Sequence, residues 1–85
     1  MQSKCLAARR LKALVESDPG ALIRVLQFFQ ARNVIPLSVS AQRVGAEFVE
    51  IEIDVAEDDL CDEGLRLTVA RVNELPIAIC AVVCD

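Results

Sequence analysis

The sequence predicts an α+β domain in which the elements follow in the order strand, helix, strand, strand, helix, strand. Three segments alternate apolar and polar residues with a period of two, and a fourth short segment is apolar throughout, as expected of strands. Two longer segments repeat apolar residues at spacings of three and four, which is typical of amphipathic helices. The chain has 85 residues, enough for one hydrophobic core and too few for two. We therefore predict a single domain over residues 9–85, with residues 1–8 as an arm or an extension of the first strand.

The first predicted strand covers residues 9–16. Leu11, Ala13 and Val15 would face the core, and the residues between them would face the other side of the sheet. Residues 17–20 follow, and they include both Pro and Gly, which interrupt a strand. A turn is expected here.

The first predicted helix begins at this turn. Asp18 can accept hydrogen bonds as the N-cap, and Pro19 suits the first helical position because no N–H partner is needed there. The helix is expected to run to about Arg32. Asn33 would then end it in the left-handed conformation, which Asn tolerates better than most residues. The inner stripe of this helix comprises Leu22, Val25, Leu26 and Phe29.

A hairpin is predicted from two further alternating segments, residues 34–44 and residues 47–55. Gly45 and Ala46 would form its tight connection. Pro36 has no N–H to donate to a neighbouring strand, so the first strand of the hairpin is expected at an edge of the sheet. Its apolar face comprises Ile35, Leu37, Val39 and Ala41, and that of the second strand comprises Val49, Ile51, Ile53 and Val55.

The second predicted helix follows an acidic run at residues 57–59, which we expect at its N-terminus because the helix dipole favours negative charge there. Pro76 would stop this helix just beyond Leu75. Gly64 in its interior weakens a helix by about 1 kcal/mol relative to Ala, unless it permits close packing. The inner stripe comprises Cys61, Leu65, Thr68, Val69 and Val72, and residues 77–84 form a last strand that is apolar on both faces.

Two right-handed crossovers fold this order into a ferredoxin-like arrangement, a four-stranded antiparallel sheet with both helices on one face. The face of the sheet away from the helices would then expose several apolar side chains, which we expect a partner to cover. These outward residues are Leu14, Phe48, Ala78, Cys80 and Val82. The sheet would contribute Leu11, Val15, Leu37, Val39, Val49, Ile51, Ile53, Ile77 and Ile79 to the core.

Composition argues against several classes of function. A net charge of −4 disfavours nucleic acid as a ligand. No apolar run approaches the about 18 residues that a membrane-spanning helix needs, and no signal segment is visible, so a soluble, cytoplasmic protein without a membrane role is expected. The four cysteines form no C-x-x-C pair, and we predict no metal site and no cofactor. Without histidine, no nucleophile and base can be paired, so the chain is not expected to be an enzyme. Glu50 and Glu52 share a strand face and are interpreted as solvated.

The segment Glu16-Ser17-Asp18-Pro19-Gly20-Ala21-Leu22, with Val34-Ile35-Pro36-Leu37 at the start of the next strand, resembles the ACT family of amino-acid-sensing domains. The likeness covers residues 11–84 and is greatest to the single-ACT regulatory subunits of acetolactate synthase. In that family, similar turns bind an amino acid between the first strand–helix turn of one chain and the second strand of its neighbour. The resemblance implies a ligand site formed by Ser17, Asp18, Gly20, Ala21, Val34 and Ile35.

The physical chemistry of the turn fits such a ligand. Gly20 has no Cβ, so a carboxylate could approach the N–H groups and the positive dipole end of the helix. Ser17 and Ile35, however, occupy positions where the acetolactate synthase subunits commonly carry Asn. The sequence therefore leaves two hypotheses open. In the first, the chain is a regulatory subunit that forms a homodimer or a higher homo-oligomer, binds an amino acid and modulates a catalytic partner. In the second, it is an assembly subunit that binds no effector and uses the turn only as a helix cap.

Overall fold

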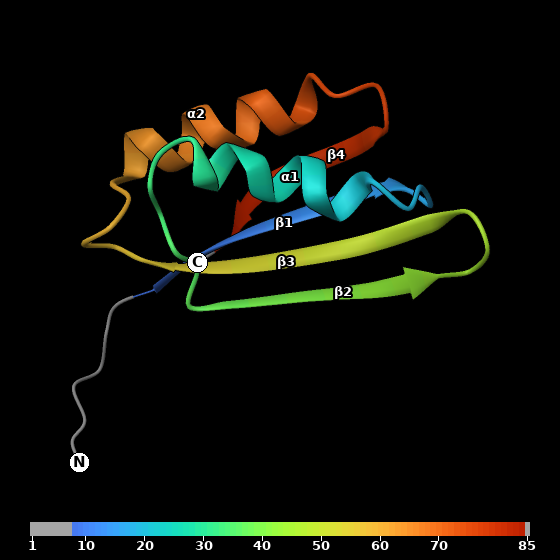
Figure 1. Ribbon diagram of the computed structural model, residues 1–85, viewed down its shortest axis with the longest axis horizontal. Helices are drawn as coiled ribbons and strands as arrows, with labels where there is room; N and C mark the ends of the chain where they lie inside the picture. The colour runs from blue at the N-terminus through green and yellow to red at the C-terminus, as the bar shows by residue number, and fades with distance from the viewer. Residues whose placement is uncertain (1–7, 85) are drawn as a thin grey trace, which may run out of the picture.

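The computed structural model describes residues 8–84, and its strands and helices follow the predicted order (Figure 1). The strands form one antiparallel sheet in the order β2-β3-β1-β4, and both helices lie on the same face. The predicted α+β, ferredoxin-like fold is thereby confirmed. The elements are β1 (Ala8–Glu16), α1 (Ala21–Gln30), β2 (Ser38–Val44), β3 (Phe48–Ala56), α2 (Asp62–Asn73) and β4 (Ala78–Cys84). The expectation of an N-terminal arm falls, for residues 1–7, outside the described residues.

The hydrophobic core lies between the two central strands and the helices. Leu11 of β1 pairs with Ile53 of β3, and Ala13 pairs with Ile51, so their side chains form adjacent rows on the helix side. The helices close this layer with residues that are fully or almost fully buried, namely Val25, Phe29, Leu65, Thr68 and Val72. Because side chains alternate across a strand, the intervening residues of β1 and β3 face the open side of the sheet.

Helix α1 begins at Ala21, later than predicted, with Gly20 as its N-cap. The Asp18 carboxylate accepts a hydrogen bond from the Gly20 N–H at 2.7 Å, and the Asp18 carbonyl accepts one from the Ala21 N–H at 2.9 Å. The roles predicted for Asp18 as N-cap and for Pro19 as the first helical residue are therefore wrong. The short Asp side chain bonds to a backbone N–H two residues on, forming a local turn that ends before the helix starts.

The end of α1 confirms the predicted role of Asn33, whose φ is 60°. The Val34 N–H donates to the Phe29 carbonyl and the Asn33 N–H to the Gln30 carbonyl, each at 3.0 Å. These two bonds define a Schellman motif, which satisfies carbonyls that the helix end would otherwise leave without partners.

Strand β2 occupies an edge of the sheet, as predicted, but starts only at Ser38. All seven of its side chains are exposed. Leu37 and Val39, predicted to lie in the core, are 46% and 40% exposed. In Figure 1 neither helix lies over β2, so the helix layer ends before it reaches this outer strand. Gly45, with a φ of 69°, begins the predicted hairpin connection to β3.

Strand β4 forms the opposite edge and contains a bulge. Leu14 pairs with Cys80, but Val15 pairs with Ala78, which leaves Ile79 as an extra residue. The bulge interrupts the alternation of side chains. Ile79, predicted to be buried, is consequently 50% exposed, and Ala78, predicted to face away from the helices, pairs with a residue of the helix-side row.

Helix α2 begins at Asp62 with Cys61 as its N-cap, and the Cys61 thiol accepts a hydrogen bond from the Gly64 N–H. The acidic residues 57–59 lie in the preceding turn, so their predicted place in the helix N-terminus is wrong. Asp62 and Glu63 supply the negative charge of the first turn instead. A Cβ at Gly64 would stand 2.6 Å from Cδ1 of Leu60. Gly64 thus does permit close packing, against the turn before its own helix.

Candidate functional site

The turn between β1 and α1 is fixed on both sides by backbone hydrogen bonds. The Ser17 N–H donates to the Glu47 carbonyl at 2.9 Å, and the Glu16 N–H donates to the Ile77 carbonyl at 2.8 Å. The side chains of Ser17 and Asp18 nevertheless face solvent. The turn therefore holds a rigid, exposed position at one end of α1.

The N-terminus of α1 at this turn has neither a side-chain cap nor an acidic residue in its first turn. No charge within the helix neutralises its positive dipole end, and the Asp18 carboxylate on the Gly20 N–H is the negative group beside it. Gly20 has a φ of −89°, which any residue can adopt, and a Cβ there would be 3.4 Å from the Asp18 carboxylate. The turn conformation does not require glycine, and the missing side chain leaves the helix end more accessible.

The segment between α1 and β2 borders a hollow of about 450 Å³. This volume lies within the range of about 300–1,000 Å³ that small-molecule sites occupy. Ile35 is 83% exposed at its rim, whereas Val34 is 6% exposed and belongs to the core. Its lining residues are mostly apolar, with two amides, and comprise Leu26, Phe29, Gln30, Asn33, Val34, Ile35 and Pro36.

The six residues implied by the resemblance form two groups at opposite ends of α1 (Figure 1). Ser17, Asp18, Gly20 and Ala21 lie at its N-terminus, and Val34 and Ile35 follow its C-terminus. A helix of ten residues is about 15 Å long, so one chain does not bring the groups together. Ala21 is 2% exposed, so its side chain, like that of Val34, faces the core and cannot touch a ligand.

Sequence reasoning missed the residues of α1 that line the hollow. Leu26 and Phe29 were assigned to the core stripe, and Gln30 was given no functional role. Phe29 is indeed buried, and it also lines the hollow beside the segment between α1 and β2. A signal was present in Pro36, because the residue before proline favours an extended backbone that leads the chain away from the helix.

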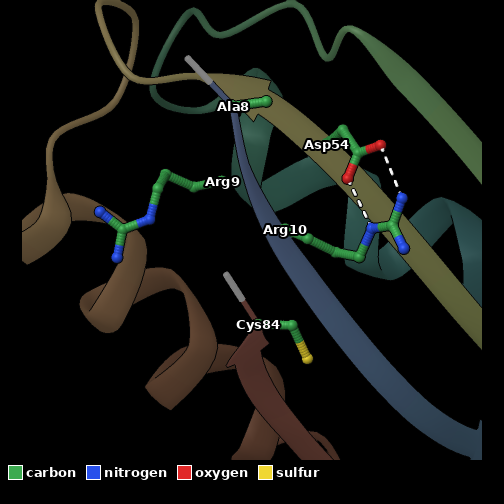
Figure 2. A pocket seen from close by; sticks show the side chains of 5 residues that line it. All are labelled: Ala8, Arg9, Arg10, Asp54 and Cys84. Atoms are coloured by element: carbon green, nitrogen blue, oxygen red, sulfur yellow. Dashed lines mark hydrogen bonds and ion pairs between the residues drawn. The ribbon is translucent and has the colours of Figure 1, made fainter.

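A second hollow, of about 350 Å³, lies at the start of β1 and is lined by Ala8, Arg9, Arg10, Asp54 and Cys84. Figure 2 shows Arg10 directed at Asp54 and Arg9 directed away from both, on the α2 side. Arg10 donates from Nε and Nη2 to the two carboxylate oxygens at 2.7 and 3.1 Å. Arg9 pairs with Asp62 of α2. The charged side chains of this hollow thus form ion pairs within the protein, and we assign the hollow a structural role.

The same ion pair is part of a ladder across the open face of the sheet. Lys12 approaches Glu50 and Glu52 at 3.5 and 3.6 Å, and the Ser38 hydroxyl donates to Asp54 at 2.9 Å. The Arg10 guanidinium lowers the pKa of the Asp54 carboxyl, and the Ser38 hydroxyl acts in the same direction, while partial burial opposes them. Glu50 and Glu52 are half-buried and paired, so their interpretation as merely solvated is corrected. Charged residues therefore occupy the middle of the face on which Leu14, Phe48, Cys80 and Val82 lie.

Within residues 8–84, no group of three or more His, Cys, Asp or Glu side chains is placed to hold a metal ion. No helix in the described part of the chain is long and apolar enough to cross a membrane.

A scan against models of protein families and a search of curated proteins found no match. Solved structures do resemble the chain. The C-terminal domain of the MgtC protein from Mycobacterium tuberculosis superimposes with a TM-score of 0.76 at 11% identity, over 99% of this chain and 92% of that one. The ligand-free regulatory subunit of aspartate kinase from Thermus thermophilus superimposes with a TM-score of 0.72 at 17% identity, over 94% of this chain. For the regulatory subunit of aspartate kinase from Thermus flavus the TM-score is 0.69 at 15% identity, over 93% of this chain.

The chain has the fold of these regulatory subunits. It spans 52% of the length of each aspartate kinase subunit, so it corresponds to about half of either one. At these identities the likeness is one of architecture. It agrees with the fold implied by the ACT resemblance, and it does not single out the acetolactate synthase subunits.

Proposed function

We propose that this protein is a regulatory module of the ACT type, which binds an amino-acid effector between two copies of the chain and modulates a catalytic partner. One observation carries the proposal: the accessible N-terminus of α1 and the hollow before β2 lie at opposite ends of the same helix. Each is half of a ligand site. The regulatory role is supported by the shared fold with the aspartate kinase regulatory subunits, and acetolactate synthase is the partner that the sequence resemblance proposes.

Two-fold pairing would complete the site. If the β2 edges of two copies pair, their α1 helices run antiparallel, and the N-terminus of one lies near the C-terminus of the other. Exposed apolar side chains beside this edge, at Ile35, Leu37 and Val39, would be covered by the same pairing.

The chemistry of the two halves defines the class of effector. The N-terminus of α1 suits a carboxylate. The hollow offers the side chains of Leu26, Phe29 and Pro36 to an apolar group, and the amides of Gln30 and Asn33 to polar atoms. An amino acid with an apolar side chain matches both halves, because its carboxylate suits the helix N-terminus and its side chain suits the hollow, whereas a charged side chain does not match the hollow.

The alternative function is that of an assembly subunit without an effector. It is favoured by Ser17 and Ile35, which provide no side-chain amide to hold the ligand, and it uses the same β2 surface for pairing. This function predicts a dimer whose stability no amino acid changes.

Calorimetric titration with the twenty amino acids separates the two functions, and complementation between variants then locates the site. Gly20→Glu fills the helix N-terminus with a tethered carboxylate, and Gln30→Glu places a charge in the lining of the hollow. Each variant alone should lose binding. An equimolar mixture, unfolded and refolded together, should regain binding at about a quarter of the wild-type stoichiometry, because each mixed dimer holds one intact site.

Two outcomes would contradict the composite site. If the refolded mixture binds nothing while the wild type binds, the two groups of residues do not belong to one site shared between chains. If only one of the two variants loses binding, the ligand contacts one end of α1 alone. If the wild type binds none of the twenty amino acids, the sensing function is excluded and the assembly function remains.

A further inference from the structure

Strand β4 is an edge strand with unusual composition. Among the strands of residues 8–84 it has no neighbour on its outer side, and residues 77–83 include no charged residue and no proline. Ile79 and Val82 are 50% and 49% exposed. A row of free backbone groups flanked by apolar, β-branched side chains is a template for the addition of another strand. Such an edge needs protection in a protein that assembles to a finite size.

The side chain of Asn73 occupies this edge. Its Nδ2 donates to the Ala81 carbonyl at 3.1 Å, and its Oδ1 accepts from the Ala81 N–H at 2.9 Å. The N–H and C=O of Ala81 therefore point away from β1, and the amide meets both of them as a residue of a neighbouring strand would. Asn73 is the last residue of α2, which holds the amide against the middle of β4.

The bulge at Ile79 lies two residues before Ala81, in the pairing of β4 with β1. A bulge bends its strand, and a bent edge is a poorer template for another strand. The Asn73 amide covers the middle of the outer edge, and the bulge bends the strand near its beginning. By contrast, no side chain in residues 8–84 bonds to a backbone group of β2.

We propose that Asn73 closes the β4 edge against strand addition by a second copy of this chain, so that pairing through sheet edges is confined to β2. The closure of β4 stands on the Asn73 geometry alone, and only the use of β2 rests on the function proposed above. Copies with both edges open would pair alternately through β2 and through β4. Such alternating pairing produces an open-ended assembly and not a closed one of fixed size.

Sedimentation of Asn73→Ala tests the closure. The variant should form species that grow with concentration, with a weight-average mass at least about twice that of the wild-type assembly. Adding Val39→Glu, which places a charge on β2, should limit the double variant to dimers paired through β4. Gln27→Ala is the matched control, because it removes a side-chain amide from an exposed position of α1 that lines neither hollow, and it should leave the assembly unchanged.

A peptide probe distinguishes failure of this proposal from failure of β2 pairing. A synthetic strand with the sequence of residues 78–84, with serine in place of both cysteines, should bind Asn73→Ala and not the wild type, whether or not the wild type is a dimer. If the wild type proves to be a monomer, Asn73→Ala should be a dimer. Should the alanine variant not fold, Asn73→Ser carries the same expectations, because its hydroxyl is too short to reach both groups of Ala81. A folded variant that keeps the wild-type mass and does not bind the peptide would overturn the proposal.

Discussion

The surroundings of Asp54 predict that the stability of the fold depends on pH. Its carboxylate accepts two hydrogen bonds from Arg10 and one from Ser38, and these lower its pKa. A carboxyl with a lower pKa in the folded chain stabilises the fold above its unfolded pKa of about 3.9. That contribution is lost as the pH falls through the folded value.

We therefore expect Asp54→Asn to be less stable than the wild type at pH 7 and to show a smaller disadvantage at pH 3, which is below the unfolded pKa. Urea unfolding at both pH values measures the difference, and the other carboxylates cancel because both proteins carry them. Asp58→Asn, at an exposed position of the turn before α2, is the control and should show no such dependence. The same difference in free energy of unfolding at both pH values would contradict the role of the ion pair.

At the residue scale, the sequence predicts what depends on neighbours in the chain. Asn33 could be assigned to the end of α1, because its left-handed conformation is a local requirement. The start of α1 could not be placed, because Asp18 can bond to more than one nearby N–H and sequence does not choose between them. Asn73 gave no signal, since its partner Ala81 is positioned by the register of β4.

Among the elements, α2 depends most on a single close contact. Gly64 faces Leu60, which is 6% exposed, and a Cβ at Gly64 would lie 2.6 Å from the Leu60 Cδ1. A methyl group at position 64 would improve helix propensity by about 1 kcal/mol. Overpacking of a buried contact costs about 1–3 kcal/mol. The contact with Leu60 should therefore determine whether a methyl group at position 64 stabilises or destabilises the protein.

Gly64→Ala is accordingly expected to destabilise the protein by about 1 kcal/mol, with the packing cost exceeding the gain in propensity. In a Leu60→Ala background the obstructing methyl group is absent, and the same substitution should stabilise by up to about 1 kcal/mol. Chemical denaturation of the wild type, the two single variants and the double variant gives the four free energies of unfolding of a double-mutant cycle. An effect of the same sign in both backgrounds would show that Leu60 does not limit this position.

The elements also show where periodicity stops being informative. The alternation in residues 34–44 predicted a strand, Pro36 predicted its edge position and Gly45 its hairpin, and the structure contains all three. It could not predict that Leu37 and Val39 are exposed, because that depends on how far two helices extend over four strands. The prediction that Ile79 is buried was wrong for a different reason. A bulge moves side chains from one face of the sheet to the other without altering the apolar character of the strand.

For the whole molecule, the β2 edge is the surface on which the proposed assembly depends. Val39→Glu should convert the dimer to a monomer, because two-fold pairing would bring both introduced charges into a desolvated contact. Leu67→Glu is the matched control, since Leu67 is 50% exposed on α2 and Val39 is 40% exposed. Sedimentation velocity should show the monomer only for Val39→Glu. Equal masses for the two variants would argue against pairing through β2.

The whole-molecule view also explains why the site could be predicted only in part. The turn at residues 17–20 and the segment at residues 34 and 35 were proposed from sequence, and the structure places them at opposite ends of α1. No pattern within one chain can state which surfaces of two chains meet.

The central claim is that two chains together form one amino-acid site, and calorimetric titration of Val39→Glu tests it most directly. Val39 does not line the hollow and is remote in sequence from the β1–α1 turn. At concentrations where the variant is monomeric, we expect it to bind none of the amino acids that the wild-type dimer binds. A monomer that binds the effector with wild-type affinity would contradict the account, because the site would then lie within a single chain.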